Sequence, residues 1–149
     1  MNQVETLLSN VPLYAQWVYK CDSSVRIKTV HSNDFYYYIR SGFPFPFSDR
    51  DLIVHSQQWV DTATGIYHSH STASPDMITA NPDVVRITVF ESTWEISPMP
   101  DGQVQINYFA KSNPGGDIPV WLINMAIARG PYETMKKFAA LATANRTIN

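Results

Sequence analysis

Apolar residues recur at three- and four-residue steps in two segments, one at each end of the chain. The first runs from Val4 to Tyr19 and predicts a helix that Pro12 interrupts. The second, Asp117–Arg146, predicts a long helix in which Gly130-Pro131 should introduce a kink or a loosened turn. Its predicted apolar face consists of Trp121, Met125, Ala128, Tyr132, Met135, Phe138 and Leu141.

Between the two helices the pattern changes to alternation, with β-branched and aromatic residues separated by turn residues. Short turns between consecutive strands are typical of an antiparallel meander, and Met99–Gly102 is the clearest hairpin. We predict six strands: Val25–Val30, Phe35–Ser41, Asp51–Val60, Gly65–Ser71, Val85–Ser97 and Gln103–Lys111. The expected fold class is therefore α+β, with a curved antiparallel sheet packed by the long C-terminal helix.

Composition and charge exclude several classes of protein. The chain has 149 residues, enough for one domain, and a net charge of −2 that argues against a nucleic-acid partner. The lone Cys21 excludes an internal disulfide framework, and no apolar run is long enough to span a membrane. The first residues do not form a signal peptide, so a cytoplasmic location is expected for the chain as written.

Several local motifs agree with this order of elements. Phe43-Pro44-Phe45-Pro46 leads to Asp49-Arg50-Asp51, and Val84-Val85-Arg86-Ile87 opens the strand that carries Trp94. Asn113-Pro114-Gly115-Gly116 precedes Ile118-Pro119-Val120-Trp121. Together these motifs resemble the START family, the steroidogenic-acute-regulatory-related lipid transfer domains. The resemblance extends from about Val4 to about Ala142 and implies a helix-grip fold.

The resemblance has one departure. START domains carry another helix and about three strands ahead of the point that matches Met1, so the first part of their sheet has no counterpart here. Residues 1–149 are thus expected to form a single START-like domain without those elements. An open sheet edge invites pairing with another chain, so we expect a homodimer.

The resemblance also implies a ligand: a lipid or other hydrophobic small molecule between the sheet and the long helix. Transfer of that ligand, with transient membrane contact, is a further expectation. On residue types alone a solid core, in which the wall residues pack against each other, is favoured; the resemblance reverses this and favours a ligand cavity. The wall residues are Tyr37, Trp59, Trp94, Ile106 and Tyr108 from strands, and Trp121, Met125, Ala128 and Tyr132 from the helix. Thr72–Asp83 is a long loop suited to a lid.

Arg50 has two interpretations. The resemblance implies a polar anchor for the head or hydroxyl of a lipid, because the matching arginine of START domains lies beside the lipid tunnel. From the residues alone, an arginine between Asp49 and Asp51 is more often part of a structural salt bridge.

An enzyme is the alternative, because polyketide cyclases and aromatases share the helix-grip plan and use the same cavity. That function would require His68, His70 or Glu91 to point inward. His68 and His70 share a strand face, but no third metal ligand lies nearby, and Glu91 with Glu95 is expected on a wet face. We therefore expect no catalytic residues, no bound metal and no cofactor. A third alternative is a chain whose role is only assembly through its open edge.

Overall fold

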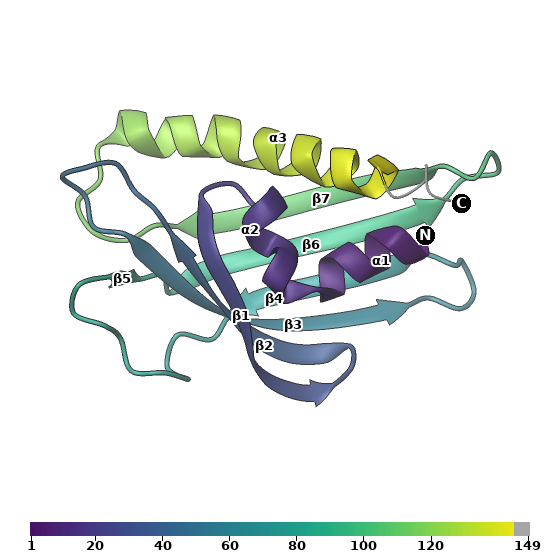
Figure 1. The fold of residues 1–149 in the computed structure, drawn as a ribbon, viewed down its shortest axis with the longest axis horizontal. Coiled ribbons are helices and arrows are strands. Elements are labelled where there is room, and N and C mark those ends of the chain that lie inside the picture. The colour runs from purple at the N-terminus through teal and green to yellow at the C-terminus, as the bar shows by residue number, and fades with distance from the viewer. Residues whose placement is uncertain (145–149) are drawn as a thin grey trace.

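The computed structural model describes residues 1–144, and Figure 1 shows their arrangement. A strongly curved antiparallel sheet forms the body of the molecule. The long helix α3 (Val120–Ala144) runs along one side of it, and short N-terminal helices lie in front of it (Figure 1). The helices and one face of the sheet share a single apolar core, so we call that face the inner face.

The N-terminal segment is helical but broken, as the proline predicted. Helix α1 (Asn2–Ser9) buries Val4, Leu7 and Leu8, which recur on one face. A turn of 3₁₀ helix, η1 (Val11–Leu13), follows, with proline at its start, and α2 (Tyr14–Trp17) continues from it. This break lets the chain turn so that both Val11 and Trp17 are buried.

The sheet contains all the predicted strand regions. Its main path has the order β1-β2-β3-β4-β6-β7, in which each neighbour is antiparallel. The strands on that path are β1 (Cys21–His31), β2 (Asp34–Ser41), β3 (Arg50–Val60), β4 (Tyr67–Ala73), β6 (Val89–Pro98) and β7 (Val104–Asn113). Strands β1 and β7 are the two edges. The turn between β6 and β7 uses Gly102 at a positive φ of 78°, which favours glycine.

The single strand predicted over Val85–Ser97 is wrong in one respect. It is divided into a short β5 (Val85–Arg86) and β6, and β5 pairs in parallel with the start of β3. The break follows from local bonding: the Ile87 N–H donates to the Asp51 carbonyl, and the Arg86 guanidinium binds the Asp51 carboxylate. The chain is therefore held against β3 before it crosses to β4.

Helix α3 is continuous through Pro131, so the proline does not end it. Its fully buried residues are Leu122, Thr134 and Phe138. Thr134 accepts a hydrogen bond at Oγ1 from the Tyr19 N–H (3.0 Å), which ties α3 to the end of the N-terminal segment. Arg146, the last residue of the predicted helix, lies outside the described residues.

Candidate functional site

Aromatic rings fill the space where α2, α3 and the sheet meet. Trp94 of β6 packs on Phe138 of α3 with ring centroids 5.0 Å apart, and on Tyr108 of β7 at 4.4 Å. Trp17 of α2 completes the group, 4.9 Å from Phe138 and 5.8 Å from Trp94. Tyr37 of β2 joins through Tyr14, whose ring lies 5.2 Å away. These contacts make an apolar wall on the inner face beneath the second half of α3.

Hydroxyl groups run alongside this wall. Ser56, Ser69, Ser71 and Ser92 are buried on the inner face, where cross-strand pairing places Ser71 between Ser56 and Ser92. The Ser71 hydroxyl donates to Ser56 Oγ (3.0 Å) and also bonds the Tyr37 hydroxyl. Burial raises the pKa of Tyr37, and it raises that of Tyr108 to about 12, so both phenols stay neutral. On β4, β6 and β7 no inner-face position carries a charged side chain.

Arg50 is buried at the start of β3, and its guanidinium is bonded to backbone. Its Nε donates to the Pro114 carbonyl (3.1 Å), Nη2 to the Gly115 carbonyl (2.9 Å) and Nη1 to the Ser48 carbonyl. Desolvation lowers its pKa. These bonds hold the segment between β7 and α3 against the start of β3.

The carboxylates on either side of Arg50 bind other arginines. Asp49 binds Arg40, and Asp51 binds Arg86. The structural salt bridge expected for Arg50 is therefore wrong, because neither neighbouring carboxylate contacts its guanidinium and its bonds go to carbonyl oxygens instead.

The nine predicted wall residues lie in three different places: the inner face of the sheet, its outer face and helix α3. Tyr37, Trp94, Ile106 and Tyr108 all lie on the inner face in or against the core. Trp59 lies on the opposite, outer face, where it stacks on His68. On α3, Trp121, Ala128 and Tyr132 are exposed, and Met125 is half-buried outside the core cluster.

The sequence analysis missed one residue of the wall and two buried residues of α3. Trp17 was assigned to no site, although Tyr14 and Trp17 are spaced by three residues and so share a helical face. Leu122 and Thr134 line the buried side of α3, about one residue in register away from the predicted apolar face. A helix that is apolar nearly all round gives no periodic signal to choose between these faces.

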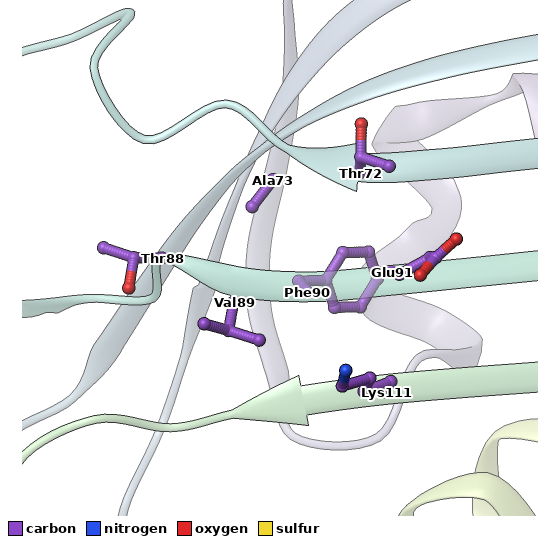
Figure 2. A pocket seen from close by; sticks show the side chains of 7 residues that line it. All are labelled: Thr72, Ala73, Thr88, Val89, Phe90, Glu91 and Lys111. Carbon is purple, nitrogen blue, oxygen red and sulfur yellow. The ribbon is translucent and has the colours of Figure 1, made fainter.

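Two shallow pockets are the most prominent among residues 1–144, and neither has an α3 residue in its lining. The larger, about 240 Å³, lies where β4 and β6 separate (Figure 2). It is lined by Thr72, Ala73, Thr88, Val89, Phe90, Glu91 and Lys111. The second, about 220 Å³, lies on the outer face beside Trp59 and His68. Both are smaller than usual pockets for drug-sized ligands.

Comparison with known families decides the classification. Residues 1–147 match the START domain. The chain belongs to the START family. The START domain resemblance of the local motifs and the helix-grip fold are thereby confirmed.

Known proteins agree with this assignment. Pseudomonas aeruginosa protein PA1579 is 26% identical over 139 residues, covering 93% of this chain and 68% of that protein. The STAR-related lipid transfer protein from Xanthomonas axonopodis superposes with a TM-score of 0.83 at 25% identity, covering 95% of this chain and 78% of that one. Human STARD10 has the same fold (TM-score 0.81, 20% identity), with 95% and 58% covered.

Three of the four histidines of this START domain lie on the outer face of the sheet, each beside a carboxylate. His55 bonds Asp34 (2.7 Å) and His70 bonds Glu91 (3.0 Å), while His68 lies 4.0 Å from Glu95. None of these groups points into the aromatic wall. Among residues 1–144 no cluster of three or more such side chains is arranged to hold a metal ion.

None of the helices in the described part of this START domain is both long and apolar enough to cross a bilayer. The longest, α3, carries Arg129, Lys136 and Lys137 together with Glu133, which is typical of a helix with one face in water.

Proposed function

We propose that this START domain binds a lipid or other hydrophobic small molecule between the inner face of the sheet and α3. The observation that carries the proposal is the way α3 is attached. Its second half is fixed by Phe138 and Thr134, whereas in its first half Leu122 is buried but Val120, Trp121 and Ile127 are exposed. Exposed apolar side chains on this less firmly packed half leave room for a ligand to take the place of missing packing.

Binding would follow from burial of apolar area. A ligand that enters beneath the first half of α3 and reaches the wall beneath its second half meets Ile106 and Tyr108 on β7, both part of the uncharged inner wall. Each Å² of apolar surface removed from water contributes about 25 cal/mol, offset by ordering of the helix. The binding is non-catalytic. The structure does not support the cyclase alternative, which requires His68, His70 or Glu91 to point inward, because all three lie on the outer face.

Native mass spectrometry of protein purified from cells, followed by organic extraction, tests the proposal. A mass increment that disappears on extraction, together with a lipid in the organic phase, is the expected result. Only apo protein, with no uptake from phosphatidylcholine vesicles afterwards, would refute it.

Membrane contact during transfer is proposed at one end of the molecule. Phe45, which is 97% exposed, lies on the loop between β2 and β3. Met77 and Ile78 are exposed on the next long loop, and Trp121 at the start of α3. Arg50 and Arg86 bind all three of these regions at the start of β3, so the apolar tips gather at one end of the sheet (Figure 1).

The charged residues flanking these tips are mainly acidic, including Asp76, Asp83 and Asp117, which favours a bilayer without net negative charge. Phe45→Asp should therefore reduce co-flotation with phosphatidylcholine vesicles. Val25→Asp, at an exposed apolar position on β1, serves as the matched control. Equal flotation of both variants and the parent would exclude this end as the contact.

A homodimer through the open edge is proposed as well. Strand β7 is an edge with unpaired backbone groups, and exposed Ile127 and Tyr132 of the neighbouring α3 are apolar. A second copy could cover both surfaces at once around a two-fold axis. Light scattering should give twice the mass of 16.9 kDa, and a monomer at working concentration would exclude the dimer.

A further inference from the structure

One buried polar atom in the core has no partner. Among residues 1–144, Trp17 Nε1 is the buried side-chain nitrogen or oxygen that makes no hydrogen bond, and Trp17 is only 3% exposed. An indole N–H can only donate, so it needs an acceptor. Buried polar groups in folded proteins almost always have a partner, and each exception requires an explanation.

The ring neighbours of Trp17 do not accept its N–H in this structure. Trp94 and Phe138 carry no acceptor group, and both pack edge-on against the Trp17 ring. The third neighbour, Tyr14, has a hydroxyl oxygen able to accept, but that hydroxyl is directed at the Leu8 carbonyl, to which it donates. The Trp17 N–H therefore has no partner among the described residues and can donate to a molecule that enters the wall.

The side chains of the wall favour a ligand without a charged group. Inner-face positions of β4, β6 and β7 are uncharged, and the polar groups beside Trp94 are hydroxyls such as that of its cross-strand partner Ser69. The cations on the inner face of the other strands are already engaged. Arg50 donates to three carbonyls, and Arg26 of β1 packs over the Phe35 ring and donates to the Ser9 carbonyl. An ionised group placed against the wall would be desolvated without a free counter-charge, which is strongly unfavourable.

We propose that Trp17 Nε1 is the polar subsite of the ligand cavity and donates a hydrogen bond to an uncharged ligand oxygen. The ligand class is an otherwise apolar molecule with one hydroxyl or carbonyl oxygen. This inference rests on the proposed function and adds a specificity-determining residue to it. A neutral hydrogen bond of this kind should favour the oxygen-bearing ligand by about three- to ten-fold.

Nuclear magnetic resonance of the wild-type protein tests the contact directly. The four tryptophans give four indole N–H signals, which substitutions of the exposed Trp59 and Trp121 help to assign. The probes are 1-hexadecanol and hexadecane, delivered from cyclodextrin. Hexadecanol should move the Trp17 indole proton downfield relative to hexadecane, while the Trp59 signal stays in place. Identical Trp17 shifts with both probes would overturn the inference.

Trp17→Phe gives an independent test because it removes the N–H and keeps an aromatic ring. Uptake of the two probes from phosphatidylcholine vesicles is measured by gas chromatography. The variant should lose the preference for hexadecanol over hexadecane. An unchanged preference overturns the inference and leaves the proposed function standing, whereas no uptake of either probe by wild type overturns both. If the variant does not fold, the wild-type spectra decide.

Discussion

Two Arg–Asp pairs near the start of β3 differ mainly in burial, and this contrast supports a quantitative prediction. In the first pair the side chains of Asp51 and Arg86 are 2% and 9% exposed, with Nε–Oδ1 at 2.6 Å. Arg86 also donates to the Pro75 and Ile78 carbonyls, so it holds the loop between β4 and β5. In the second pair the side chains of Arg40 and Asp49 are 41% and 32% exposed, at 3.1 Å.

Arg86→Met should be far more costly than Arg40→Met. Removing Arg86 leaves the buried Asp51 carboxylate without its counter-charge, which lowers the free energy of unfolding by about 3–5 kcal/mol. Removing Arg40 breaks a solvent-screened pair worth less than about 1 kcal/mol. With a urea m-value of about 2 kcal/mol/M, the first change lowers the midpoint by roughly 2 M and the second by less than about 0.5 M.

Urea unfolding followed by circular dichroism measures both midpoints. The double variant Arg86→Met/Asp51→Leu should recover part of the loss, because it also removes the stranded carboxylate. Limited proteolysis should cut the loop near Ile78 faster in Arg86→Met than in Arg40→Met. Equal midpoints for the two single variants would refute the argument that burial decides the value of these pairs.

Three further predictions concern the core and the ligand site. Phe138→Ala removes a fully buried ring and should lower the free energy of unfolding by about 3–5 kcal/mol. Its melting temperature should fall several times more than that of the exposed control Tyr132→Ala. Equal shifts would contradict the packing of α3. Met125→Trp should fill the space beneath α3 and reduce lipid uptake from vesicles without unfolding the protein, and unchanged uptake would show that the ligand lies elsewhere. Burial raises the pKa of the Cys21 thiol from 9.0 to about 11. The neutral buried thiol therefore contributes its full stability below pH 9, and this contribution is lost as the pH rises toward 11. The urea midpoint should therefore fall more between pH 8 and 10.5 in wild type than in Cys21→Ser.

The strands were predictable because alternation and turn residues are local signals. Every strand on the main sheet path overlaps its predicted range, and the hairpin at Met99–Gly102 lies where its residues placed it. The division of Val85–Ser97 was not predictable. It depends on the contact of Arg86 with Asp51, 35 residues away, which no local pattern encodes.

The sheet side of the candidate site was predictable except for Trp59, and the helix side was predictable only in part. Side chains alternate strictly along a strand, and Tyr37, Trp94 and Tyr108 share the inner face, whereas Trp59 was expected there and lies on the outer face. On α3, Phe138 was expected inside and is buried, but Trp121 and Tyr132 were also expected inside and are exposed. The first half of α3 is apolar nearly all round, so periodicity could not identify its buried side.

The bond between Tyr19 and Thr134 joins positions 115 residues apart, and the contact of Phe138 with Trp17 has a similar span. During synthesis the N-terminal helices and all strands leave the ribosome before this part of α3 does. Trp94 and Tyr108 must therefore remain without their helical cover until Phe138 has been synthesised. Nascent chains of this protein should depend on holding chaperones over that interval, and dependence should end once residue 138 has emerged.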